Sequence, residues 1–179
     1  MSVLNVQKLI EDRVQSIRHY HRRFGIKRAE LDVSGGVDSA VMLMLLAVAL
    51  GPENITAVYS SINSSPASRE RAQAVATAAG VKLIDLDLSK AFNLIGCEVA
   101  RALEVAGYDG QELSERDAND RTIAGSFRSC LRAPVGRYLN RLTGGGVRHG
   151  TGNEDEDRRL RFYQKGGDGE VDTNPIAML

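Results

Sequence analysis

Glycines, hydroxyls and one carboxylate follow one another at residues 34–39, which read SGGVDS. The segment stands between a short apolar run and the start of a helical pattern. Glycines permit backbone angles that other residues avoid, and the amides and dipole at a helix start bind anions. Ser34 and Ser39 add hydroxyl donors, and a phosphate would repel Asp38 unless Mg²⁺ lay between them. The segment therefore predicts a phosphate-binding loop with Asp38 as a metal ligand.

The same residues also allow a simpler interpretation. A Gly-Gly pair alone can form a turn, and Asp38 can be no more than a helix cap. The string lacks a Gly-Lys-Ser/Thr ending, and so it lacks the lysine of a Walker loop. The order of strand, loop and helix favours phosphate binding over a turn alone.

A second group of polar residues lies near the C-terminal end, where residues 150–157 read GTGNEDED and residues 165–172 read KGGDGEVD. Consecutive acids by themselves are typical of a solvated surface or of a helix start. A carboxylate from this group placed opposite Asp38 would let two acids share one Mg²⁺ with phosphate oxygens. Taken together, the two groups favour a site for a metal and a nucleotide.

Hydrophobic periodicity predicts the elements that position these segments. Apolar residues recur every three or four positions from Val3 to Phe24, which predicts a helix ended by Gly25. Strands and helices then alternate, as is typical of a parallel sheet with helices on both faces. The expected strands are residues 29–33, 55–59 and 81–86, and the expected helices are residues 39–50, 66–80, about 97–106 and 122–142.

Three further expectations concern the character of these segments. The helix at residues 39–50 is apolar almost all round and is expected to be buried. Residues 107–120 are polar and predict a loop, and Pro134 is expected to disturb the last helix. The Gly-rich and acidic tail at residues 144–179 predicts functional loops more than core.

Composition excludes several classes of protein. The chain has 179 residues, enough for one domain, and its 23 basic and 23 acidic side chains give no net charge. A general nucleic-acid binder is therefore not expected, although a basic cluster occupies residues 18–28. The longest apolar run, residues 40–50, is about half the roughly 20 residues of a membrane-spanning helix. No secretory signal is visible, and two cysteines without a CxxC pattern predict reduced thiols in the cytoplasm.

The string at residues 34–39 resembles the SGGxDS pyrophosphate loop of the ATP pyrophosphatases, which cleave ATP between the α- and β-phosphates. A GT-x-x-x-x-E segment at residues 150–156 and a Lys-x-Gly-Asp-Gly segment at residues 165–169 extend the resemblance to the ammonia-dependent NAD synthetases. This resemblance implies an α/β fold of the adenine nucleotide α-hydrolase type, which is Rossmann-like. It also implies that residues 1–179 form a single domain that ends before the family's C-terminal segment.

The implied reaction is a C–N ligation in NAD biosynthesis. Deamido-NAD is adenylated by ATP with release of pyrophosphate, and ammonia then displaces AMP to give NAD. The resemblance implies Mg²⁺ as a cofactor and a homodimer in the cytoplasm, with no nucleic acid, no membrane and no covalent nucleophile. The apolar stripe from Val3 to Phe24 could supply the dimer interface or cover its own sheet.

The resemblance also assigns roles to single residues. It places Mg²⁺ on Asp38 and Glu156, and it places deamido-NAD on Arg132, Lys165 and Asp172. The implied ATP contacts are Asp32, Val33, Ser34, Gly35, Gly36, Val37, Asp38, Ser39 and Thr151.

Some positions differ from the family pattern. Ser126 replaces an Asn, residues 147–149 read VRH where the family strand is apolar, and the spacing from Glu156 to Lys165 is one residue longer. Arg128 and Arg132 lie four residues apart on one helix face, so that either could contact a phosphate.

Several alternatives stay open at this point. His149 could be a base or a structural histidine. The acceptor could instead be that of a GMP synthetase or of the tRNA-thiolating relatives. The chain could also be a non-catalytic nucleotide-binding fragment.

Overall fold

Four parallel strands form one sheet in the order β3–β2–β1–β4. The computed structural model describes residues 5–155, 164, 166–167 and 169–177. The strands are β1 (Ala29–Asp32), β2 (Ile55–Ser61), β3 (Leu83–Asp87) and β4 (Val147–His149). The helices are α1 (Val6–Phe24), α2 (Val37–Leu50), α3 (Pro66–Ala78), α4 (Ser89–Val105), α5 (Gly110–Asn119) and α6 (Arg121–Leu142), with a 3₁₀ turn at Pro52–Asn54.

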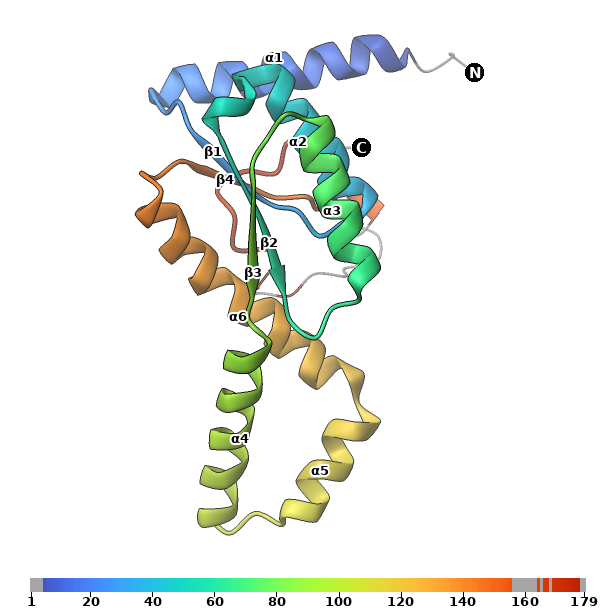
Figure 1. The fold of residues 1–179 in the computed structure, drawn as a ribbon, viewed down its shortest axis with the longest axis vertical. Coiled ribbons are helices and arrows are strands. Elements are labelled where there is room, and N and C mark those ends of the chain that lie inside the picture. The colour runs from blue at the N-terminus through green and yellow to red at the C-terminus, as the bar shows by residue number, and fades with distance from the viewer. Residues whose placement is uncertain (1–4, 156–163, 165, 168, 178–179) are drawn as a thin grey trace.

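Helices cover both faces of the sheet, as the sequence predicted (Figure 1). Helices α2 and α3 connect neighbouring parallel strands and lie with α1 on one face, while α6 runs across the other. Leu31, Met42, Leu43 and Leu46 are fully buried between β1 and α2 and form the centre of the core. Helices α4 and α5 project away from the sheet.

The order of the strands reverses at β1. From β1 the chain moves through α2 to β2 and then β3 on one side, and it returns through α4, α5 and α6 to β4 on the other side. In open parallel sheets, ligands bind outside the carboxyl ends of the strands at such a reversal. Residues 33–36 and 150–151, which follow β1 and β4, therefore lie where a ligand is expected.

Local signals at the helix ends explain why several boundaries were predictable. Helix α1 begins after Asn5, whose side chain accepts from the Lys8 amide, and it ends at Gly25, which has a left-handed φ of 66°. Helix α3 begins after the capping residue Ser65, with Pro66 in its first turn.

The expectation that the helix at residues 39–50 is buried almost all round is wrong. Helix α2 buries Ser39, Met42, Leu43, Leu45 and Leu46, but its opposite side is exposed. The exposed side chains follow one another at helical spacing and are Val37, Val41, Met44 and Val48. Apolar residues on all sides hide the period that would have shown which face meets the sheet.

The prediction of a loop at residues 107–120 is also wrong. The residues form α5, which Asp109 caps by accepting from the amides of Gln111 and Glu112. Pairs four residues apart, such as Glu112 with Arg116 at 2.6 Å, support this polar helix. Because α5 buries none of its residues, it carries no apolar periodicity that could reveal it.

Two other helices are more regular than predicted. Helix α6 continues through Pro134, which lies inside it. Helix α4 begins at Ser89, several residues before the predicted start. Within the described residues, no helix combines the length and the apolar character needed to cross a bilayer. Cys97 and Cys130 are not joined by a disulfide.

Candidate functional site

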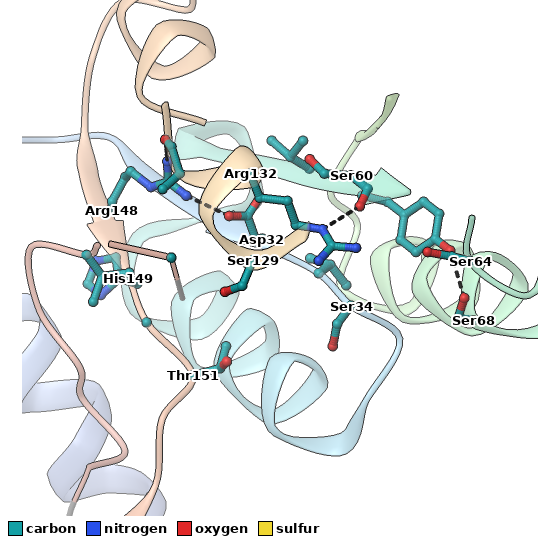
Figure 2. Close-up of a pocket in the computed structure, with 17 residues that line it drawn as sticks. Asp32, Ser34, Ser60, Ser64, Ser68, Ser129, Arg132, Arg148, His149 and Thr151 are labelled. Carbon is teal, nitrogen blue, oxygen red and sulfur yellow. Dashed lines mark hydrogen bonds and ion pairs between the residues drawn. The ribbon is translucent and has the colours of Figure 1, made fainter. Parts of the chain in front are cut away.

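A cavity of about 250 Å³ lies at the carboxyl ends of β1, β2 and β4. Figure 2 shows its polar side chains, which come from β1, β2, β4, α3 and α6 and from the loops that follow β1, β2 and β4. Four of the predicted ATP contacts line it directly, namely Asp32, Val33, Ser34 and Thr151. The cavity therefore lies at the strand reversal where the topology predicts a ligand.

The loop after β1 combines a left-handed glycine with two linked serines. Gly35 has a φ of 81°, a conformation that favours glycine. The Gly36 amide donates to Ser34 Oγ at 3.2 Å, and Ser39 Oγ donates to the Gly36 carbonyl at 2.9 Å. Ser34 Oγ and Ser39 Oγ are 3.2 Å apart. These contacts fix the loop directly in front of α2.

The helix start that follows suits an anion. The N-cap of α2 is Gly36, which has no side chain, so the interpretation of Asp38 as the cap is wrong. The first helical hydrogen bond runs from the Ala40 amide to the Gly36 carbonyl. The amides of Val37, Asp38 and Ser39 precede it and are among those that a helix leaves without an internal partner. They supply the donors that the sequence predicted for a phosphate.

Asp38 lies in the first turn of α2 and meets the second polar group. Asn153 Nδ2 donates to Asp38 Oδ1 at 3.4 Å, which is a long hydrogen bond. The contact places the segment after β4 beside the loop after β1. Asp38 can offer oxygen ligands to Mg²⁺ there. Glu156, the second predicted metal ligand, lies outside the described residues.

Asp32 forms an ion pair within the protein. Its Oδ2 atom accepts from Arg148 Nη2 on β4 at 2.6 Å. Burial raises the pKa of the Asp32 carboxyl, and the nearby Arg148 and Arg132 counteract that rise. Asp32 thus joins β1 to β4 at the floor of the cavity.

Arg148 is the centre of a buried ionic network. Only 5% of this residue is exposed, and its Nη1 atom donates to the Ala133 carbonyl of α6 at 3.2 Å. Its Nε atom lies 3.5 Å from Glu30 Oε1 on β1. Burial raises the pKa of Glu30 to about 7, although the Arg148 charge opposes this. The sequence showed an arginine where the family strand is apolar, but it did not show that Asp32 and Glu30 would be its partners.

Of the two arginines that the sequence left open, Arg132 lies in the cavity. Its Nε atom donates to the Ser60 carbonyl at the end of β2 at 2.9 Å, and Arg132 and Ser34 line the same cavity (Figure 2). Burial lowers its pKa, but an arginine stays charged. Arg128 lies instead over the Phe92 ring, 6.0 Å from its centroid.

The segment after β4 is held close to the sheet. The Gly150 amide donates to the Thr173 carbonyl at 2.8 Å, and a Cβ at Gly150 would come within 2.8 Å of Val171 Cγ2. Gly167 packs against Ser129 of α6, where a Cβ would collide with the serine side chain. These close approaches explain the glycines and place Thr151 at the cavity.

Asp172, predicted to contact deamido-NAD, accepts two hydrogen bonds within the protein. Its Oδ1 atom accepts from Arg137 Nη1 at 2.9 Å and its Oδ2 atom from the Arg148 amide at 2.8 Å. Partial burial favours the neutral carboxyl, but these two hydrogen bonds and the charges of Arg137 and Arg148 together outweigh it and lower the pKa of Asp172. Asp172 does not line the cavity formed by the described residues. Lys165 lies outside the described residues.

The structural interpretation of His149 is confirmed. The residue is only 3% exposed, and its Nε2 atom lies 3.0 Å from His21 Nε2. Burial, and then the neighbouring His21, lower the pKa of His149 to about 3. The His21 Nδ1 atom meets the Ile26 carbonyl at 2.8 Å and therefore carries the proton. The contact between the two histidines thus joins α1 to β4.

Known proteins resemble this chain over most of its length. The family model described as NAD synthase matches residues 9–179. The NH(3)-dependent NAD(+) synthetase of Alkaliphilus oremlandii is 32% identical over 175 residues, which are 98% of this chain and 66% of that protein. The synthetase of the same name from Methanococcoides burtonii is 33% identical, over 87% of this chain and 53% of that protein. The chain thus spans about half to two thirds of the length of these curated relatives.

Solved structures share the fold. The NH3-dependent NAD synthetase of Campylobacter jejuni, in complex with nitrate, superposes with a TM-score of 0.80 at 20% identity, over 99% of this chain and 69% of that one. The glutamine-dependent NAD+ synthetase of Acinetobacter baumannii, in complex with ADP, superposes with a TM-score of 0.82 at 20% identity, over 100% of this chain and 31% of that one. Both likenesses agree with the predicted adenine nucleotide α-hydrolase fold.

Proposed function

Because the chain belongs to the NAD synthase family, we propose that it catalyses the amidation of deamido-NAD to NAD with ATP and ammonia. The reaction forms a C–N bond, which makes the protein a ligase of NAD biosynthesis. The observation that carries this proposal is the cavity at the strand reversal. There Ser34, in the loop that leads into α2, lines the same cavity as Thr151 and Arg132.

The first step would transfer AMP to the nicotinate carboxylate. A carboxylate oxygen attacks the α-phosphorus of ATP, and the bond between the α-phosphorus and the bridging oxygen to the β-phosphate breaks. Negative charge grows on the departing pyrophosphate. In this proposal the amides at the start of α2 and the Ser34 hydroxyl would stabilise that charge, and the Arg132 guanidinium would add a positive charge.

The second step would form the amide. Ammonia attacks the carbonyl carbon of the acyl adenylate, AMP leaves with the bonding electron pair, and the nitrogen loses one proton. No side chain forms a covalent bond in either step. The protein's contribution is to position the reactants and to neutralise charge.

Magnesium would occupy the oxygen ligands beside the loop. Asp38 in the first turn of α2 is a suitable ligand, with its Oδ1 atom held by Asn153, and Glu156 is the proposed second ligand. Bound Mg²⁺ would neutralise phosphate charge during bond cleavage. Lys165 and Asp172 stay proposed contacts of deamido-NAD. Asp172 would then share its oxygens with Arg137 and the Arg148 amide.

We further propose that the protein is a homodimer in the cytoplasm. Val6 and Ile10 of α1 are 57% and 41% exposed, and the stripe of α2 defined by Val37, Val41, Met44 and Val48 is also exposed. Exposed apolar side chains that gather on one face of a helix are typical of surfaces that contact another protein. Sedimentation velocity would test the dimer, and a monomer at micromolar concentration would contradict it.

Product analysis tests the proposed reaction. The protein is incubated with Mg²⁺, ATP and ammonium, and with deamido-NAD, XMP or tRNA as the acceptor. We expect NAD, AMP and pyrophosphate in equal amounts with deamido-NAD, and no ATP turnover with XMP or tRNA. Turnover only with XMP or tRNA would assign a different acceptor. ATP binding without turnover on any acceptor would identify a non-catalytic nucleotide-binding domain.

A further inference from the structure

Helix α3 packs directly against the loop that follows β1. The Cα hydrogens of Gly35 face the backbone of Ser68, and a Cβ at Gly35 would collide with the Ser68 carbonyl group, whose carbon would lie 3.1 Å away. Ser68 belongs to the first turn of α3 and also lines the cavity, where its hydroxyl lies 2.7 Å from Tyr59 Oη. The shape of the loop therefore depends on α3.

One side chain of α3 holds a peptide group of this loop. Arg71 lies three residues after Ser68, and its Nε atom donates to the Gly35 carbonyl at 2.9 Å. The contact joins residues that are 36 positions apart. Arg71 is exposed and does not line the cavity formed by the described residues. Its effect on a bound ligand would therefore pass through the loop.

The held carbonyl determines the direction of the next amide. In a planar trans peptide, the carbonyl of one residue and the N–H of the following residue point in opposite directions. Because Arg71 holds the Gly35 carbonyl towards α3, the Gly36 N–H points away from α3. That N–H donates to Ser34 Oγ, which lines the cavity. Without Arg71, the peptide between Gly35 and Gly36 could rotate and present its carbonyl oxygen to a phosphate, which would repel it.

We propose that Arg71 is a positioning residue for pyrophosphate binding, because it orients the peptide between Gly35 and Gly36. The inference rests on the proposed function, since it assigns the pyrophosphate to this loop. Arg71 acts through a hydrogen bond from Nε to the backbone. It follows that the orientation of the peptide depends on the N–H donor at that position more than on the positive charge of the guanidinium.

Two substitutions separate the hydrogen bond from the charge. In Arg71→Gln, the amide nitrogen occupies the same place along the side chain as the arginine Nε, so the donor remains and the charge is lost. In Arg71→Met, both the donor and the charge are lost at similar length. Arg69→Met is the matched control, since Arg69 is an exposed arginine of the same helix that pairs with Asp85 at 2.6 Å.

The test measures the affinity of each protein for inorganic pyrophosphate with Mg²⁺ by isothermal titration calorimetry. We expect about tenfold weaker binding for Arg71→Met, as is typical of losing one hydrogen bond from a charged donor, and no more than about threefold weaker binding for Arg71→Gln. Arg69→Met should bind within about twofold of the unmodified protein. The KM for ATP should rise in Arg71→Met while the KM for deamido-NAD and the melting temperature stay unchanged.

Each other outcome has a definite meaning. Unchanged affinity in Arg71→Met would overturn the inference. Equal losses in Arg71→Gln and Arg71→Met would also overturn it, because the charge would then be responsible. Equal losses in Arg71→Met and Arg69→Met would overturn it as a general effect of the helix charge. If the unmodified protein does not bind pyrophosphate with Mg²⁺, the proposed function fails and the inference fails with it.

Discussion

Replacing Gly136 with alanine should disrupt the buried contact between α6 and β4. Gly136 is buried where α6 crosses Arg148, and a Cβ there would collide with the guanidinium and lie 2.6 Å from its Cζ atom. An arginine side chain can usually move aside. Arg148 cannot do so easily, because it is 5% exposed and is held by Asp32, Glu30 and the Ala133 carbonyl.

The magnitude follows from two opposing effects. Displacing Arg148 would separate a buried ion pair, which typically costs about 3–5 kcal/mol. Alanine is about 1 kcal/mol more favourable than glycine inside a helix, which offsets part of this cost. We therefore expect Gly136→Ala to lower the free energy of unfolding by about 2–4 kcal/mol.

Gly125 provides the matched control in the same helix. A Cβ at Gly125 meets nothing within 4 Å. Gly125→Ala should therefore raise the free energy of unfolding by about 0.5–1 kcal/mol through helix propensity alone. Urea denaturation followed by circular dichroism measures both variants. If Gly136→Ala proves as stable as Gly125→Ala, the proposed tight packing of α6 over Arg148 is refuted.

Two further predictions concern the arginines of α6 and the buried acid of β1. Arg132→Met should weaken ATP binding about tenfold or more, since Arg132 lines the cavity together with Ser34. Arg128→Met should leave ATP affinity within about twofold, since Arg128 lies over the Phe92 ring. Equal losses of affinity in a titration with ATP would contradict this prediction. Glu30 has a pKa raised from 4.5 to about 7, so the folded protein binds more protons than the unfolded chain between these values and loses stability as the pH rises through this range. The expected loss of unfolding free energy is on the order of 3 kcal/mol, and Glu30→Gln should remove it. The measurement is the free energy of unfolding between pH 4 and pH 8. An equal dependence of this free energy on pH in both proteins would contradict the prediction.

Local features of the site were predictable, and long-range pairings were not. The loop at residues 34–39 carries its own signal, because glycines, hydroxyls and a carboxylate stand next to each other between a strand and a helix. Arg148 and Asp32 are 116 residues apart, and their contact depends on the register of β1 with β4. The contact of Arg71 with Gly35 likewise depends on how α3 packs against the loop.

Periodicity explains which elements were predicted correctly. Helices α1 and α3 have caps and defined ends, and the sequence predicted them within a few residues. Helix α5 is polar on all sides and α2 is apolar on nearly all sides, so that neither shows a contrast between faces. The choice between Arg128 and Arg132 required the structure, because both lie on one face of α6 and differ in which element they meet.

Isotope exchange between pyrophosphate and ATP tests the central claim most directly. The claim is that the loop at residues 34–39 binds the pyrophosphate part of ATP during cleavage next to the α-phosphorus. With ATP, labelled pyrophosphate, Mg²⁺ and deamido-NAD but no ammonia, we expect label to enter ATP through reversal of the adenylation. We expect Asp38→Asn to reduce the exchange rate about a hundredfold or more without altering the fold. Exchange that stays at the unmodified rate in Asp38→Asn, or no exchange in a protein that forms NAD, would contradict the claim.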